Sequence, residues 1–151
     1  MTPLEPCEAG AQRIRVATYN IHGWIGTDRR QMPMRAIKVI SELEADIIAL
    51  QEANFSLEQG GHLDESFFST LTGMEVVLGP TFFKHALHFG NALLSRFPII
   101  SFHRLDLSAH PYEPRGAIDA LVRVGSRTVK VITVHLGLKA VERRLQVDLL
   151  S

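Results

Sequence analysis

Three apolar segments that lie far apart in the sequence each end in one polar side chain. The segments are residues 13–19, 46–51 and 129–134, and the residues that follow them are Asn20, Glu52 and His135, respectively. Valine, isoleucine, threonine and tyrosine, which suit a pleated surface, are frequent in these segments. The pattern predicts three strands that each deliver one reactive side chain at the C-terminal end. Such an arrangement is typical of an enzyme.

A helix is predicted between the first two of these strands. Residues 33–44 place Ile37, Ile40 and Leu43 at helical spacing, and Pro33 stands where a helix can begin. A strand, a helix and a strand in succession favour a right-handed crossover between parallel or near-parallel strands.

The remainder of the chain is expected to contain several short strands and two further helices. Strands are predicted at residues 75–78, 82–88, 91–95, 99–107, 117–124 and 128–134, and helices at residues 64–72 and 140–150. Gly125 and Ser126 predict a tight turn that joins the last two strands as a hairpin. The last helix is expected to be amphipathic, and the sequence stops there without a capping signal.

Size and charge limit the possible functions. The 151 residues suffice for one domain, which we place at residues 13–151. Lys+Arg and Asp+Glu both number 16, so the formal net charge is zero. Proteins that hold nucleic acid by charge alone carry a basic excess, so strong non-specific binding to nucleic acid is not supported.

The first 12 residues predict a disordered tail rather than a signal peptide, because they contain two prolines and two glutamates but no apolar run. The single cysteine, Cys7, lies in this tail, so no internal disulfide can form, and we expect a cytoplasmic protein. No window of the sequence is long and apolar enough to span a bilayer.

Each residue that ends one of the three segments has a functional and a structural explanation. Glu52 can hold a hard cation such as Mg²⁺, or it can form a salt bridge with a loop arginine. Asn20 can hold a metal ion or a phosphate oxygen, or it can cap a turn. His135 can donate to a phosphate oxygen or protonate a leaving group, or it can be a core histidine bonded to a carbonyl.

Two further positions extend the set. Arg115 precedes a strand, where a guanidinium can clamp a phosphate by two contacts, although a solvated loop arginine is the alternative. Asn91 can line the same site at the strand ends, or it can belong to an ordinary strand with a polar end. Asparagine, glutamate, arginine and histidine together are the groups that metal-assisted phosphodiester hydrolysis requires.

Five short motifs carry a resemblance to a known family. They are TYNIHG at residues 18–23, LQE at 50–52, GNALLSR at 90–96, PRG at 114–116 and TVHL at 133–136. In this order they resemble the successive motifs of the endonuclease/exonuclease/phosphatase superfamily, and the likeness covers residues 13–151.

The resemblance implies a four-layer α/β sandwich, with two mixed β-sheets flanked by helices, and Mg²⁺ or Mn²⁺ as the cofactor. It implies that Glu52 is the main metal ligand and that Asn20 supports the metal ion and the phosphate. By the same match, His135 and Arg115 contact the scissile phosphate, and we assign Asn91 to phosphate binding as well.

Two departures from the family pattern limit this expectation. Some members carry an acidic residue two positions after the asparagine, where this chain has His22, and the later Asp-x-Asn and Asp-His motifs are absent. We therefore expect the N-terminal portion of a domain that is incomplete at its C-terminus, with only part of the active site. Such a chain should bind metal weakly and catalyse poorly on its own.

The predicted function is divalent-metal-dependent hydrolysis of a phosphodiester, of the kind that a nuclease performs. An alternative is a phosphodiesterase for a phospholipid such as sphingomyelin, towards which the neutral charge points. A catalytically inactive remnant that serves as an interaction module is the third interpretation. The uncovered apolar helix and sheet edge also predict self-association.

Overall fold

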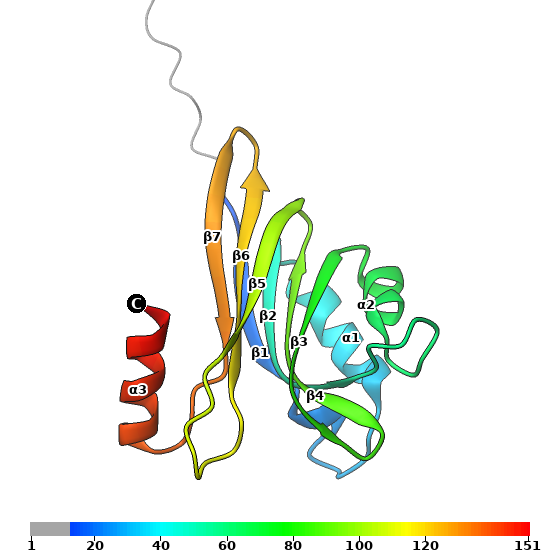
Figure 1. Ribbon diagram of the computed structural model, residues 1–151. Coiled ribbons are helices and arrows are strands. Elements are labelled where there is room, and N and C mark those ends of the chain that lie inside the picture. The colour runs from blue at the N-terminus through cyan, green and yellow to red at the C-terminus, as the bar shows by residue number, and fades with distance from the viewer. Residues whose placement is uncertain (1–12) are drawn as a thin grey trace, which may run out of the picture.

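Two β-sheets pack face to face between two layers of helices in the computed structural model, which describes residues 13–151 (Figure 1). The disordered tail predicted for residues 1–12 lies outside the described residues. In chain order the elements are β1 (Val16–Asn20), η1 (His22–Trp24), α1 (Pro33–Glu42), β2 (Ile47–Phe55), α2 (Glu65–Thr72), β3 (Glu75–Lys84), β4 (Leu87–Ser95), β5 (Ile99–Asp106), β6 (Gly116–Val124), β7 (Arg127–Val134) and α3 (Ala140–Leu150).

The first sheet has four strands in the order β1-β2-β4-β3. β1 and β2 are parallel and joined through α1, as the sequence predicts, with Val16 opposite Ile47 and Asn20 opposite Gln51. The pairs β2–β4 and β3–β4 are antiparallel. Because β1 and β2 run in the same direction, their C-terminal ends lie at the same edge of the sheet.

The second sheet has three antiparallel strands in the order β5-β6-β7. The predicted hairpin joins β6 and β7, with Val124 opposite Arg127 and a turn at Gly125, whose φ is 61°. α1 and α2 cover the outer face of the first sheet, and α3 lies outside the second (Figure 1). The expected four-layer α/β sandwich is confirmed.

The core has two parts, one on each face of the first sheet. Ile48 and Leu50 of β2 face the helix side with Ile37 and Ile40 of α1, whereas Ile47 faces the other sheet. The inward-facing residues of β6 form the opposite wall of that second part: Ile118, Ala120, Val122 and Val124. This alternation along β2 and β6 is the period-two pattern of strands with two covered faces.

Several predicted strand boundaries are wrong. β2 does not end before Glu52 but continues to Phe55, and residues 82–88 are not one strand. They form the end of β3, a turn at His85 and Ala86, and the start of β4. The strand predicted at residues 75–78 continues through Pro80 to Lys84. Pro80 is tolerated because β3 lies at the edge of the sheet, where a missing backbone N–H costs no ladder bond.

The last helix, α3, presents a polar face to the protein. Glu142 and Gln146 are buried, while Val141, Leu145 and Leu149 are 57%, 51% and 61% exposed. The helix is therefore held by polar contacts, and its apolar side chains face outward. Among residues 13–151, no helix is both long and apolar enough to cross a lipid bilayer.

Candidate active site

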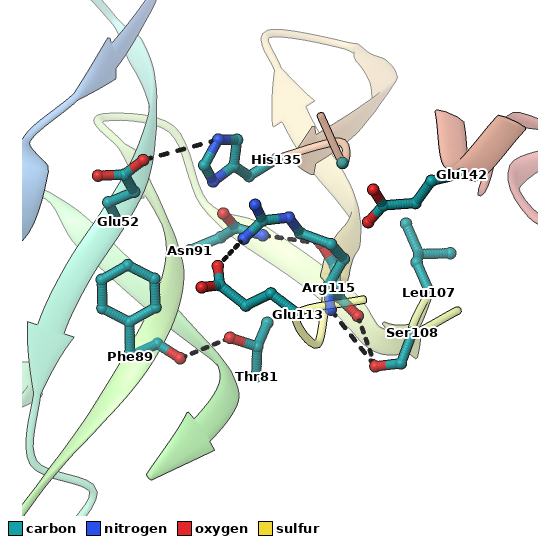
Figure 2. Close-up of polar contacts among 12 residues, drawn as sticks. Glu52, Thr81, Phe89, Asn91, Leu107, Ser108, Glu113, Arg115, His135 and Glu142 are labelled. Carbon is teal, nitrogen blue, oxygen red and sulfur yellow. Dashed lines mark hydrogen bonds and ion pairs between the residues drawn. The ribbon is translucent and has the colours of Figure 1, made fainter. Parts of the chain in front are cut away.

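Glu52 occupies a β-bulge, which decides where its side chain points. β2 and β4 pair regularly up to Leu50 and again from Ala53, with a register shift between them. Leu50 and Ala53 both lie in the core on the helix side, a spacing of three that regular alternation does not allow. The bulge frees Glu52 to turn towards the second sheet, where its Oε1 lies 3.8 Å from Nε2 of His135 (Figure 2).

Asn20, at the end of β1, and His22, in η1, also contact the Glu52 carboxylate. Nδ2 of Asn20 donates to Oε1 of Glu52 at 2.9 Å, and Nδ1 of His22 lies 3.2 Å from Oε2. Oδ1 of Asn20 accepts from the backbone N–H of His22 at 3.0 Å. Asn20 therefore orients both the carboxylate and the loop that carries His22.

The loop after β1 has an unusual backbone that places His22 near the carboxylate. His22, Gly23 and Trp24 have φ values of 47°, 62° and 70°, so three successive residues are in the left-handed region. Trp24 is 3% exposed, and its Nε1 donates to the backbone oxygen of Asn54 at 2.8 Å. The buried indole anchors this loop to β2.

Arg115, just before β6, is almost fully buried, with 8% of its surface exposed. Its guanidinium pairs with Glu113, which is itself 54% exposed at the side chain. Within residues 13–151, the buried Nε of Arg115 has no hydrogen-bond partner. Buried N–H groups are nearly always paired, so this guanidinium is suited to a second anion, such as a phosphate oxygen.

Asn91 links the two sheets beside Arg115. It is 2% exposed, and its Nδ2 donates to the backbone oxygen of Gly116 at 2.8 Å (Figure 2). Residues of both sheets line a small hollow here: Glu52, Thr81, Phe89, Gly90, Asn91, Arg115, Gly116 and His135. A carboxylate, a guanidinium and an imidazole thus face one space.

His135 follows β7 and is largely covered, with 24% of its side chain exposed. Burial first, and the positive charge of Arg115 second, lower the pKa of His135 below its ordinary value of 6.5, although Glu52 and Glu113 act in the opposite direction. The lowered pKa favours the neutral ring at pH 7, and a neutral ring offers one N–H as a donor.

The donor groups fit an open magnesium site rather than a closed cage. Throughout the described chain, residues 13–151, no three His, Cys, Asp or Glu side chains gather so as to hold a metal ion. Mg²⁺ does not need such a cage, because it keeps several waters and is held by one or two carboxylates together with substrate phosphates. Glu52 offers one partly exposed carboxylate for such a site, and the Arg115 guanidinium beside it is a group that can hold a phosphate.

The structure brings the five predicted site residues to one rim of the two sheets. They are Asn20, Glu52, Asn91, Arg115 and His135. Glu113, which pairs with Arg115, is not among the predicted residues, although it stands only two residues before Arg115 in the sequence. His22 is predicted only as the position of an absent carboxylate, whereas its ring contacts Glu52.

Comparison with known proteins gives both a family and sequence relatives. Residues 11–151 match the protein family described as "PGAP2IP, C-terminal nuclease-like domain". YbhP of Escherichia coli strain K12 is 28% identical over 148 residues, and the match covers 91% of this chain and 58% of YbhP. YbhP of Shigella flexneri matches to the same extent. The chain therefore spans less than two thirds of these relatives.

Three solved structures illustrate the fold that this chain shares with known proteins. An endonuclease/exonuclease/phosphatase from Beutenbergia cavernae has a TM-score of 0.68 at 21% identity, with 90% of this chain and 41% of that chain covered. An endonuclease/exonuclease/phosphatase family protein from Leptotrichia buccalis has a TM-score of 0.69 at 14% identity, with 91% of this chain and 62% of that chain covered. TDP2 from Caenorhabditis elegans has a TM-score of 0.60 at 14% identity, with 87% and 38% covered.

Proposed function

Because this chain belongs to the family of PGAP2IP C-terminal nuclease-like domains, with the fold of the endonuclease/exonuclease/phosphatase proteins, we propose that it carries part of the active site of a divalent-metal-dependent phosphodiesterase. Its residues 13–151 are proposed to be the N-terminal portion of that domain. The proposed substrate is a phosphodiester of the nucleic-acid type, and the proposed cofactor is Mg²⁺ or Mn²⁺. The single cysteine supports a cytoplasmic location as part of the same proposal.

One observation carries this proposal: Glu52 of the first sheet and Arg115 and His135 of the second line the same hollow. Hydrolysis of a phosphodiester needs a cation on the phosphoryl oxygen and donors that orient the phosphate. A carboxylate that can hold the cation lies here beside a buried guanidinium with an unused N–H among the described residues. One hollow is therefore lined by residues suited to both tasks, which supports the proposal.

Each residue has a role that follows from its contacts. Glu52 is proposed to hold the metal ion, which when bound would polarise the phosphoryl oxygen and stabilise charge on it. Asn20 fixes the position of Glu52 and is proposed to support the metal ion and the phosphate. Arg115 would bind a phosphate oxygen through Nε, and His135 would donate its ring N–H to the same phosphate. No residue of this sequence is assigned as the base for the attacking water.

In the absence of substrate, Asn91 contacts the backbone beside this site. Its Nδ2 is committed to the oxygen of Gly116, the residue after Arg115. It therefore fixes the start of β6 and with it the direction of Arg115. A direct contact between Asn91 and the substrate phosphate stays a prediction.

A phospholipid of the sphingomyelin type is the alternative substrate within the same chemistry. The observation that favours it is the formal net charge of zero, since enzymes that act on duplex DNA usually carry a basic surface. A comparison of hydrolysis rates on a single-stranded oligonucleotide and on sphingomyelin in mixed micelles distinguishes the two substrates.

Release of 4-nitrophenol from bis(4-nitrophenyl) phosphate tests the proposed reaction. The wild-type chain should release it faster with Mg²⁺ or Mn²⁺ than with EDTA. Glu52→Gln should lower the metal-dependent rate by at least about tenfold, the expected loss for a group that holds charge in the transition state. Glu58→Gln, an exposed loop position, is the matched control.

Metal binding separates the remaining outcomes of this test. A folded chain that binds Mg²⁺ through Glu52 but shows no turnover is the inactive interaction module of the third interpretation. A folded chain whose Mg²⁺ affinity is unchanged by Glu52→Gln contradicts the metal site itself.

A further inference from the structure

Gln146 is a fully buried amide on the inward face of α3, with 0% of its surface exposed. Its Oε1 accepts from the backbone N–H of Gly137 at 2.7 Å. Its Nε2 donates to the backbone oxygen of Leu107 at 3.2 Å and lies 3.3 Å from Oε1 of Glu142. The side chain therefore joins two backbone segments that are 30 residues apart in the sequence.

Both of these segments lead directly to the candidate active site. Gly137 is two residues after His135. On the other side, the N–H of Leu107 donates to the backbone oxygen of Arg115 at 2.9 Å, and Oγ of Ser108 accepts from the N–H of Arg115 at 3.3 Å (Figure 2). Gln146 thus holds the backbone beside both residues that are assigned to the phosphate.

Other residues of α3 fasten the same loop after His135. Glu142 is 3% exposed and lies so close to Gly137 that a Cβ there would overlap its carboxylate carbon, at 1.8 Å. Arg143 donates from its guanidinium to the backbone oxygens of Gly137 and Leu138. The polar face of α3 is therefore engaged with this loop.

The orientation of α3 is energetically unfavourable unless its buried polar side chains form hydrogen bonds. A helix on a sheet normally buries its apolar face, yet α3 exposes Val141, Leu145 and Leu149 and buries Glu142 and Gln146. Burial of an amide and a carboxylate is unfavourable unless their hydrogen bonds are made, and here they are made to the backbone next to the site.

We propose that Gln146 is a positioning residue that sets His135 and Arg115 for phosphate binding, without touching the phosphate itself. This inference rests on the proposed function. It predicts that Gln146 governs affinity for phosphate but not for Mg²⁺. The reason is that Asn20, on β1 of the first sheet, holds Glu52 by a direct hydrogen bond, whereas Gln146 bonds the backbone at Gly137 and Leu107.

The test uses Gln146→Met, which keeps the length of the side chain and removes all three polar contacts. Leu145→Ala, on the exposed face of the same helix, is the matched control. Calorimetric titration gives the affinities for inorganic phosphate and, separately, for Mg²⁺. Gln146→Met should weaken phosphate binding by about tenfold, the typical effect of a group that orients a binding site, and change the Mg²⁺ affinity by less than twofold.

Nuclear magnetic resonance of the Arg115 Nε–Hε group gives a second readout. In the wild type this signal should shift on addition of phosphate, and in Gln146→Met the shift should be smaller. If Gln146→Met does not fold, Gln146→Leu, a smaller apolar side chain that also removes the three polar contacts, should show the same loss of phosphate affinity.

Two results would overturn this inference alone: phosphate affinity equal to that of the wild type, or a parallel loss of affinity for phosphate and Mg²⁺ in a folded variant. A wild-type chain that binds neither ion would contradict the proposed function, and this inference with it.

Discussion

Glu52 carries its carboxylate on a backbone with a φ of 55°, in the left-handed region that side chains other than glycine rarely occupy. Such a conformation costs roughly 1–3 kcal/mol and persists where the surroundings determine it. Here the bulge in β2 and the hydrogen bond from Asn20 do so. The strain is explained by the direction it gives to the side chain, towards His135 and the second sheet.

His22 offers a direct test at the residue scale. In His22→Asp, one carboxylate oxygen would stand near the present position of Nδ1, which is 3.2 Å from Oε2 of Glu52. Two carboxylates at this distance repel each other when no metal ion is bound, and they can share a cation when one is present. Calorimetry should show Mg²⁺ affinity raised by about tenfold, which corresponds to about 1.4 kcal/mol.

In EDTA, the same variant should have a lower melting temperature than the wild type. Addition of Mg²⁺ should reduce this difference in melting temperature. His62→Asp, at an exposed loop position, is the control and should change neither quantity. Unchanged Mg²⁺ affinity in folded His22→Asp would mean that the Glu52 carboxylate is not where the cation binds.

At the scale of the element, α2 depends on its first residue. Asp64 precedes the helix, and its carboxylate accepts from the N–H groups of Gly60 and Phe67 and from the hydroxyl of Ser66. The Ser66 hydroxyl first, then these N–H groups, lower the pKa of Asp64 below its ordinary value of 3.8. The ionised form therefore stabilises the fold above pH 3.8, and this contribution is lost as the pH falls through the lower pKa of the folded state.

The pH dependence of Asp64→Asn should follow from this. Since an amide cannot accept from both Phe67 and Gly60, the variant should melt several degrees below the wild type at pH 7. The two melting temperatures should converge below pH 3.8, where protonated Asp64 resembles the amide. Glu65→Gln, the exposed neighbour, is the control. A difference that stays constant from pH 7 to pH 3 would exclude the charge of Asp64 as its cause.

The elements also show which parts of the fold the sequence can reveal. Residues 33–44 carry a helical period, and residues 117–134 carry alternation around a glycine turn, so local patterns were enough there. Glu52 was placed one residue after a strand, because alternation gives no sign of a bulge inside one. The turn at His85 and Ala86 lacks glycine, proline and asparagine and was therefore not recognised, although both residues have positive φ.

At the scale of the whole molecule, the site exists only where the two sheets meet. Sequence motifs predict which residues belong to the candidate site, but not that Gln146 bonds the backbone beside it or that Glu113 pairs with Arg115. The contacts of Gln146 join segments 9 and 39 residues away, which no local pattern records. A polar residue in an amphipathic helix is ordinarily assigned to solvent, and here it is buried.

The apolar side chains exposed on the surface of the molecule predict self-association. Val141, Leu145 and Leu149 form an exposed apolar stripe on α3. Analytical ultracentrifugation should show a sedimentation coefficient that rises with concentration. The double variant Leu145→Lys/Leu149→Lys should weaken the association by about tenfold or more, since each leucine contributes roughly 1.5–3 kcal/mol when buried. A wild-type chain that stays monomeric at every concentration would contradict this.

The central claim is that a cation on Glu52 and a phosphate on Arg115 and His135 occupy adjacent positions. Binding of the two must then be coupled, and the coupling can be measured as the affinity for diethyl phosphate, a simple phosphodiester anion, with and without saturating Mg²⁺. Mg²⁺ should tighten diethyl phosphate binding by about tenfold, a coupling of about 1.4 kcal/mol, and Glu52→Gln should remove this gain. Equal affinities with and without Mg²⁺, or a coupling that survives in Glu52→Gln, would contradict the account.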